Sequence, residues 1–191
     1  MARTREFDVD RAIDRATDLF WRRGYAETSL QDLLQELSIG SGSFYAAFGS
    51  KEQLYVRCLE RYTSLQGSDL EKTLDGTTEI RPAVRKVLTS MIEADLAEPS
   101  RGCLVVSAST QCGEQPAAAE RVTAAVRQVE SQLAGALEQA QVRGEISPDK
   151  DPRKLARFLT TFIQGIRIVG QARTGREFTE DALSVAMRAL D

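Results

Sequence analysis

The 191-residue sequence contains no histidine and no asparagine. Without histidine, the chain has no imidazole for Ser-His-Asp or Cys-His catalysis or for a metal site. Its three cysteines, Cys58, Cys103 and Cys112, are spaced unlike the ligands of a zinc site, and no GxxxxGK[ST] phosphate-binding loop occurs. The sequence therefore predicts a protein that is not an enzyme and that has no cofactor and no metal. A Lys or Glu general base remains the open alternative, although no spacing in the sequence points to one.

Long apolar runs are also missing. The sequence has no stretch of about 18 apolar residues, and residues 1–6 run into charges with no apolar segment of a signal peptide. These absences predict no membrane span, no secretion and a cytoplasmic protein whose three thiols are free. With 42% hydrophobic and 28% charged residues, the composition is that of a globular chain that buries a core.

The charge balance does not suggest a protein that binds nucleic acid. The formal net charge is −3, and residues 1–64 contain 9 Lys/Arg against 10 Asp/Glu, while the remainder contains 16 against 18. Any contact with DNA must therefore depend on a local group of cations and hydrogen-bond donors, because the field of the whole chain is not attractive.

Apolar residues recur at helical spacing along nearly the whole chain, and no alternating strand pattern appears. Residues 103–108 alone resemble a buried strand, but no partner strand exists elsewhere, so a buried helix is favoured. Helices are expected over residues 9–23, 29–37, 43–48, about 50–65, about 82–98, 103–108, 116–143, about 152–170 and about 179–190. The expected N-caps are Asp8, Thr28, Ser50, Asp151 and Thr179.

Two of the short helices, 29–37 and 43–48, are joined by the turn 38–42 and form a helix-turn-helix pattern. Phe44 and Phe48 share one face, which is expected to be buried. Ser43, Ala46 and Ala47 are small enough for a helix to enter a major groove about 12 Å wide. From the pattern alone, an ordinary helical corner and a DNA-binding motif are equally good interpretations.

Residues 28–54, TSLQDLLQELSIGSGSFYAAFGSKEQL, resemble the DNA-binding domain of the TetR/AcrR family of bacterial transcriptional regulators. The resemblance covers about residues 8–65, and Arg101-Gly102-Cys103-Leu104 is typical of one branch of the family. It rests on Phe20, Gly24, Tyr25, Thr28, the leucine stripe, Gly42-Ser43-Phe44-Tyr45, Phe48, Ser50-Lys51-Glu52 and Leu54.

The resemblance implies an all-α chain of nine helices. A DNA-binding domain at 6–50, with its motif at 29–48, would be followed by a linker helix at 51–66 and a ligand-binding and dimerisation domain at 67–191. The implied function is that of a homodimeric repressor, released from a palindromic double-stranded operator DNA by a small hydrophobic effector. A helical interaction protein without sequence-specific DNA recognition is the alternative, and the weak positive charge favours it slightly.

The family pattern can be transferred residue by residue, with two departures. The turn lacks the usual cap serine and lysine, so Ser41 is expected to take over the capping, and Ala46-Ala47 replaces a pair that is often aromatic or histidine. Contacts to the DNA backbone are implied for Arg3, Arg5, Thr28, Ser29, Tyr45 and Lys51. Base reading then depends on Ser41, Ser43 and the methyl group of Ala46.

Two further sets of residues follow from the apolar stripes of the later helices. Plain core packing is the alternative for any one of the pocket residues, and sensing through Cys112 is disfavoured by the acidic neighbour Glu114. The effector pocket is expected at Tyr62, Leu88, Met91, Ile92, Val106, Val126 and Phe162. The dimer interface is expected at Phe162, Ile166, Val169, Leu183 and Met187.

Overall fold

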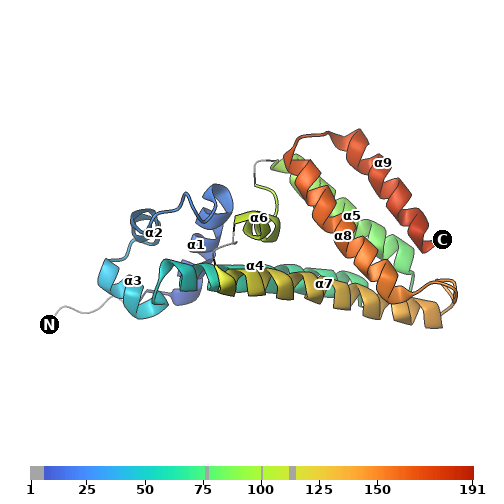
Figure 1. Ribbon diagram of the computed structural model, residues 1–191, viewed down its shortest axis with the longest axis horizontal. Helices are drawn as coiled ribbons and strands as arrows, with labels where there is room; N and C mark the ends of the chain where they lie inside the picture. Colours follow the sequence, from blue (N-terminus) through green and yellow to red (C-terminus); the bar gives the residue numbers. More distant parts are fainter. Residues whose placement is uncertain (1–6, 76–77, 100, 112–114) are drawn as a thin grey trace.

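The computed structural model describes residues 7–75, 78–99, 101–111 and 115–191, and no strand occurs within these ranges. The chain is elongated, with α1 to α3 at one end and α5, α8 and α9 at the other (Figure 1). The helices are α1 (Val9–Arg23), α2 (Leu30–Leu37), α3 (Ser41–Phe48), α4 (Lys51–Leu74), α5 (Ile80–Ala97), α6 (Leu104–Gln111), α7 (Pro116–Val142), α8 (Pro152–Gln171) and α9 (Arg176–Met187), followed by a short 3-10 turn (Arg188–Leu190).

Local sequence signals set most helix starts. Asp8, Ser50 and Asp151 cap α1, α4 and α8 as predicted, each accepting hydrogen bonds from backbone N–H groups of the first turn. The other two predicted caps are wrong. Ser29 rather than Thr28 caps α2, and α9 begins at Arg176, which places Thr179 inside the helix.

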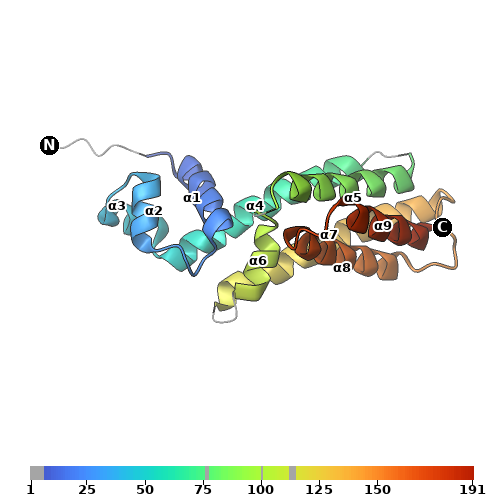
Figure 2. The ribbon, with the colours of Figure 1, turned by 90° about the horizontal axis from the view of Figure 1, so that it is seen from above.

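Helix α4 is longer than its sequence pattern predicts, since it continues past Leu65 to Leu74. Its polar second half contains a buried stripe of Gly67, Leu70 and Leu74. Gly67 lies against the side chain of Gln128 on α7: a Cβ atom would lie 2.5 Å from its Nε2, so a larger residue there would displace the end of that side chain. Segment 67–75 is therefore part of a long helix that runs beside α7, as Figures 1 and 2 show.

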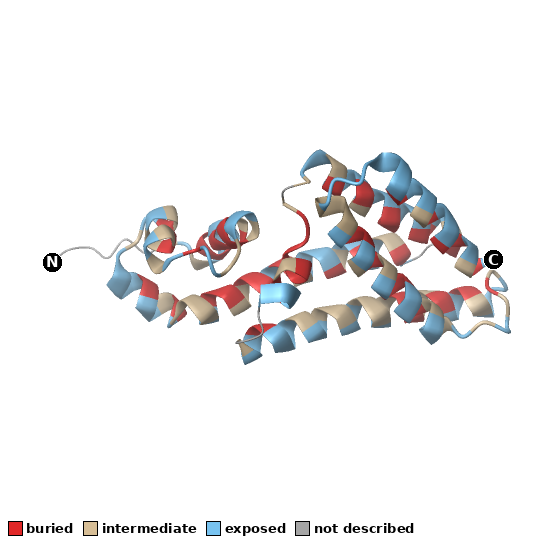
Figure 3. Cartoon of the chain, turned by 45° about the horizontal axis from the view of Figure 1, so that its top comes forward, coloured by how far each residue is buried: buried red, intermediate tan, exposed pale blue. Residues whose placement is uncertain are grey.

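Two hydrophobic clusters hold the chain together. The first joins α1 to α3 and the first part of α4 to α6 and to Ala118 of α7. The second joins the end of α4 to α5, α7, α8 and α9. Figure 3 shows the buried residues on the inward faces of both groups of helices. The segment 103–108, predicted as a helix, is helical from Leu104 and packs with the N-terminal helices.

Within the described residues, no helix is long and apolar enough to cross a membrane. The same residues contain no group of three or more Cys, Asp or Glu side chains that could hold a metal ion.

Candidate DNA interface and ligand cavity

Helix α2 is held at its start by a reciprocal pair of hydrogen bonds. The Asp32 N–H donates to Oγ of Ser29 at 3.1 Å, and the Ser29 N–H donates to Oδ2 of Asp32 at 2.8 Å. The hydrogen bonds from Ser29 lower the pKa of Asp32, and Arg23 at 3.0 Å lowers it further. The Ser29 side chain thus caps α2, and it is also exposed to solvent at the start of that helix.

Helix α3 presents small polar side chains to the outside. Phe44 and Phe48 are buried, as predicted, and Tyr45 is 51% exposed. Ser41, Ser43 and Ala46 are exposed on the same helix. Helix α3 starts at Ser41, two residues earlier than predicted, with Gly40 as N-cap and no capping side chain, so the predicted capping by Ser41 is wrong.

The start of α4 places a cation next to this surface. The Nζ atom of Lys51 lies 4.2 Å from the centre of the Tyr25 ring, and partial burial lowers the pKa of Lys51. Arg57, two turns further along α4, donates to the carbonyl of Ala47 at 3.1 Å and so holds the end of α3.

The structure contradicts one predicted DNA contact. Thr28 is fully buried, and its hydroxyl donates to the carbonyl of Gly24 at 2.7 Å, so it positions the chain between α1 and α2. Arg3 and Arg5 lie outside the described residues. Two other basic side chains near the motif, Arg15 and Arg23, are paired with Glu36 and Asp32.

A large cavity lies between α4, α5, α8 and the end of α1. Its volume is about 520 Å³, and a smaller cavity of about 60 Å³ on the α7 side shares four of its lining residues. The shared residues are Gln66, Leu70, Met91 and Arg167. The large cavity is also lined by Trp21, Asp69, Asp95, Glu98, Arg101 and Gly102. These charged side chains were not predicted by the apolar stripes.

Arg167 and Asp95 form a buried ion pair at this cavity. The two side chains are 7% and 5% exposed, and Nη1 of Arg167 lies 3.0 Å from Oδ1 of Asp95. Arg167 also donates to the carbonyls of Met91 at 3.2 Å and Gly102 at 3.0 Å. Burial raises the pKa of Asp95, although Arg167 opposes this shift. No sequence motif marks the pair, because its members are 72 residues apart.

The predicted pocket residues are distributed over several environments. Met91 and Val126 line the cavities, and Phe162 is half-buried against the second cluster. Tyr62 is buried beside Cys103, and burial raises its pKa. Leu88, Ile92 and Val106 are buried in the two hydrophobic clusters and line neither of these cavities.

Three predicted interface residues face the interior of the chain. Ile166, Leu183 and Met187 are buried in the second cluster, which contradicts a role in contacts with another subunit. Phe162 and Val169 are half-buried. The outward-facing apolar side chains of α8 and α9 are Phe158, Ile168, Phe178 and Val185, which are 44 to 60% exposed.

The thiols described by the structure are shielded from solvent. Cys58 and Cys103 are both buried and free, as their apolar stripes indicated, and burial raises the pKa of Cys58 to about 12. Cys112 lies outside the described residues.

Two family models match the chain. The model described as "Bacterial regulatory proteins, tetR family" matches residues 12–58. The model described as "Tetracyclin repressor-like, C-terminal domain" matches residues 80–187, which is more than half of the chain.

Individual proteins are similar over nearly their whole length. The repressor ComR of Escherichia coli (strain K12) is 31% identical over 182 residues, which cover 91% of this chain and 83% of ComR. The uncharacterized regulator YezE of Bacillus subtilis (strain 168) is 28% identical over 100% of both chains. A solved structure of a cysteine mutant of the regulator CifR, complexed with 26-base-pair operator DNA, superposes with a TM-score of 0.88 at 32% identity. It covers 99% of this chain and 100% of CifR.

Proposed function

The chain belongs to the TetR family of bacterial transcriptional regulators, DNA-binding proteins that are not enzymes, and we propose how its own residues carry out this function. It acts as a homodimer that represses transcription at a palindromic operator, and a small-molecule effector releases it. Residues 6–50 bind DNA, α4 connects them to the rest of the chain, and the segment after it holds the effector and the second subunit.

The exposed surface of α3 is the observation that supports this mode of DNA binding. Phe44 and Phe48 anchor α3 in the first cluster, so Ser43, Tyr45 and Ala46 are free to face a major groove. We assign phosphate contacts to Tyr45, Lys51 and Ser29, with Arg3 and Arg5 as candidates in the N-terminal arm. Base contacts fall to Ser43, Ser41 and the methyl group of Ala46.

Selection of genomic DNA fragments by the purified protein tests this assignment. Two copies of α3 related by a two-fold axis should select imperfect palindromes whose half-sites are about 34–36 Å apart, one turn of B-DNA. Recovery of fragments without a shared sequence would favour the alternative, a helical interaction protein without specific DNA recognition. The weak positive charge of the chain and the pairing of Arg15 with Glu36 and of Arg23 with Asp32 favour that alternative.

The dimer surface is assigned to the outward faces of α8 and α9. Phe158 and Ile168 on α8 and Phe178 and Val185 on α9 are large apolar side chains with at least 44% of their surface exposed. At about 100° per residue, Phe178 and Val185 lie on one line along α9, and Phe158 and Ile168 lie about 80° apart on the outer side of α8. Packing two such pairs against each other gives a four-helix interface.

A charge on this surface tests the assignment. Ile168→Glu should convert a dimer at micromolar concentration into a folded monomer in analytical ultracentrifugation, because an unpaired charge would be buried between subunits. Val142→Glu is the matched control, since Val142 is 90% exposed at the end of α7. A wild-type chain that sediments as a monomer would refute the dimer.

We assign the effector to the two adjoining cavities. They contain an apolar part, formed by Leu70, Met91 and Val126, and the buried Arg167–Asp95 pair. A ligand of this site therefore combines an apolar body with at least one hydrogen-bonding group. Screening of small molecules for those that raise the unfolding temperature tests the site, because stabilisation should be lost in Met91→Trp, which fills the space between the cavities.

A further inference from the structure

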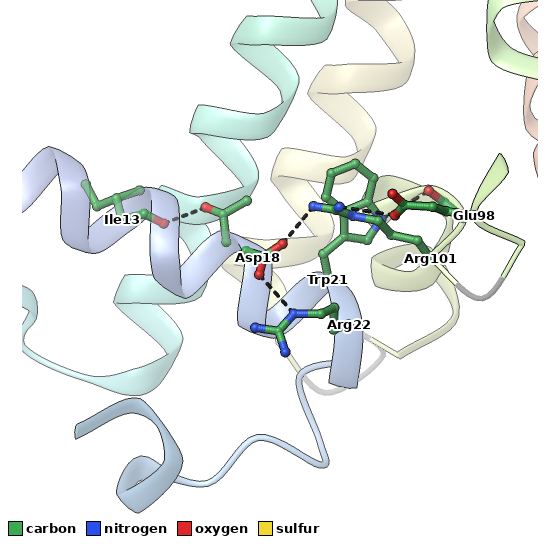
Figure 4. Close-up of polar contacts among 8 residues, drawn as sticks. Ile13, Asp18, Trp21, Arg22, Glu98 and Arg101 are labelled. Atoms are coloured by element: carbon green, nitrogen blue, oxygen red, sulfur yellow. Dashed lines mark hydrogen bonds and ion pairs between the residues drawn. The ribbon is translucent and has the colours of Figure 1, made fainter. Parts of the chain in front are cut away.

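Arg101 connects the large cavity to the first helix of the DNA-binding domain. Its guanidinium carbon lies 4.0 Å from the centre of the Trp21 ring, and its Nη2 donates to Oδ1 of Asp18 at 2.7 Å. Its Nη1 donates to Glu98 at 3.2 Å. Figure 4 shows the Arg101 side chain extended over Trp21 between Glu98 and Asp18. We call Asp18, Trp21, Glu98, Arg101 and Gly102 the junction.

A backbone carbonyl joins the junction to the buried ion pair. The carbonyl of Gly102 accepts one hydrogen bond from Nε1 of Trp21 at 3.1 Å and another from Nη2 of Arg167 at 3.0 Å. One atom thus contacts both α1 and α8. Gly102 has a φ of +58°, and an added Cβ atom would collide with the side chain of Gln171, so any other residue at this position would be strained.

Both sides of the junction line the large cavity. Trp21 comes from the DNA-binding domain and Arg101 from the connection between α5 and α6, and each faces the same space of about 520 Å³. A molecule in that space competes with Arg101 for the face of Trp21. The Nε atom of Arg101 is buried without a hydrogen-bond partner among the described residues, so it can gain one when the side chain moves away from Trp21.

We propose that the junction holds α1 in the orientation that binds operator DNA, and that a ligand in the large cavity weakens DNA binding by displacing Arg101 from Trp21. This inference rests on the proposed function. It assigns the link between the cavity and the DNA surface to the contact of Arg101 with Trp21. When α1 is held in a fixed orientation, both copies of α3 can contact their half-sites without losing further conformational entropy. The smaller entropy cost raises the affinity for DNA. The ligand is planar and apolar, with an oxygen acceptor for Arg101 or Arg167.

The first test removes the junction without touching the DNA surface. Arg101→Ala should weaken binding to a selected operator about five- to tenfold, as expected for one partly exposed ion pair and one cation–π contact per subunit. Arg22→Ala is the matched control, because Arg22 pairs with the other oxygen of Asp18 at 2.9 Å but does not line the cavity. Equal affinities of the two variants, or tighter binding by Arg101→Ala, would overturn the proposal.

The second test fills the cavity with a covalent probe and needs no DNA. Ala94 is exposed and lines the cavity, so Ala94→Cys labelled with N-phenylmaleimide, in a Cys112→Ser background, places an aromatic imide there. Trp21 is the sole tryptophan and reports directly on the junction. Its emission should shift to longer wavelength, and acrylamide should quench it more strongly, when the label displaces Arg101.

Two controls make the second test decisive. Thr89→Cys is exposed on the same helix outside the cavity lining, so its label should leave Trp21 emission unchanged. In a variant that also carries Arg101→Ala, Trp21 has already lost its contact with the guanidinium. The label on Ala94→Cys should therefore change Trp21 emission little further. An Ala94 label that leaves Trp21 emission unchanged in protein with Arg101 would refute the displacement. Failure of the unlabelled protein to bind any operator would instead refute the proposed function.

Discussion

The surface around α3 and the junction between α1 and the α5–α6 connection are built in opposite ways. Around α3, two of the contacts join residues no more than about ten positions apart, the Ser29–Asp32 pair and the Arg57–Ala47 hydrogen bond, and Lys51 contacts the ring of Tyr25, 26 positions before it. At the junction, Asp18 and Arg101 are 83 residues apart, and Trp21 and Gly102 are 81 apart. The proposed DNA surface thus depends largely on residues near one another in the sequence, whereas the proposed regulatory junction depends on contacts between distant segments.

This difference has an energetic counterpart. Ser43, Tyr45 and Ala46 at the proposed DNA surface are exposed, so their replacement should change affinity and leave the fold intact. The cavity that borders the junction contains the buried Arg167–Asp95 pair, so replacements there should change stability as well. Each of the following predictions tests one side of that contrast.

Loss of Arg167 should have the largest effect on stability. Arg167→Met leaves the Asp95 carboxyl buried without its cation and should lower the free energy of unfolding by about 3–5 kcal/mol in urea titrations. Arg157→Met, which breaks a more exposed pair with Glu130, should cost at most about 1 kcal/mol. An equal decrease in the free energy of unfolding in the two variants would show that burial of the Arg167–Asp95 pair does not increase the cost of breaking it.

The effect of Arg167→Met should also depend on pH. Burial already raises the pKa of Asp95 above the unfolded value near 3.8, so the folded state holds its proton more tightly. Stability associated with this group is therefore present at low pH and is lost as the pH rises through the raised pKa. Without Arg167 the pKa rises further, and the variant should lose less stability at pH 4.5 than at pH 7.5. An equal loss at both pH values would contradict this.

Gly170 tests how tightly α8 packs at the ion pair. A Cβ atom on Gly170 would lie 2.9 Å from Cβ of Asp95 and 3.0 Å from its Oδ2, so Gly170→Ala should destabilise the chain by about 1–3 kcal/mol. Gly135→Ala is the matched control in α7, where an added Cβ meets no atom within 4 Å. It should stabilise the helix by about 0.5–1 kcal/mol, and thermal unfolding of both variants measures the difference.

On the DNA side, Tyr45 and Ser43 should separate affinity from specificity. Tyr45→Phe removes a hydroxyl assigned to a phosphate and should weaken binding by about 1 kcal/mol per subunit, to the same extent on every operator variant. Ser43→Ala should instead change the preferred base, with a discrimination of about 1–3 kcal/mol. Anisotropy titrations of a panel of single-base operator variants measure both, and equal loss of specificity would reverse the assignment.

The smallest predicted effect is a change in how strongly DNA affinity depends on salt concentration. Arg3, Arg5 and Lys51 are the cations assigned to phosphates, so six per dimer should give a slope of log Kobs against log [salt] near −5. Lys51→Gln should make this slope shallower by about 2, because each dimer then displaces two fewer counterions. Lys72→Gln, on the exposed far part of α4, should leave the slope unchanged, and a slope as steep as −10 would require further phosphate contacts.

The sequence predicted what depends on neighbouring residues. The bounds of α1 and the burial of Phe44 and Phe48 agree with the structure because capping and apolar spacing act within a few residues. The predicted N-cap of α2, Thr28, is wrong by one residue because Thr and Ser are both good N-caps. Ser29 is the cap in the structure, and it is followed three positions later by the acidic Asp32, which completes the capping box.

Errors increased where the choice depended on distant parts of the chain. Helix α8 is apolar around much of its surface. The spacing of its apolar residues therefore does not show that Ile166 faces the core while Ile168 faces outward. Helix α4 was cut short at Leu65 because its second half is polar on the side away from α7. The Arg167–Asp95 pair had no signal in the sequence. Arg101 and Gly102 belong to a segment typical of one branch of the family, but the sequence did not show that they contact Trp21 and Asp18, because those contacts exist only once the helices have packed.

The most direct test of the coupling between these two regions is a distance measurement in the free dimer. Spin labels on Gln35→Cys, an exposed position of α2, report the separation of the two DNA-binding domains in a Cys112→Ser background. With Arg22→Ala the distribution should be as narrow as in the wild type. With Arg101→Ala it should broaden or shift by several ångströms and narrow again on operator DNA. Identical distributions for Arg101→Ala and wild type would contradict the role of the junction in positioning α3.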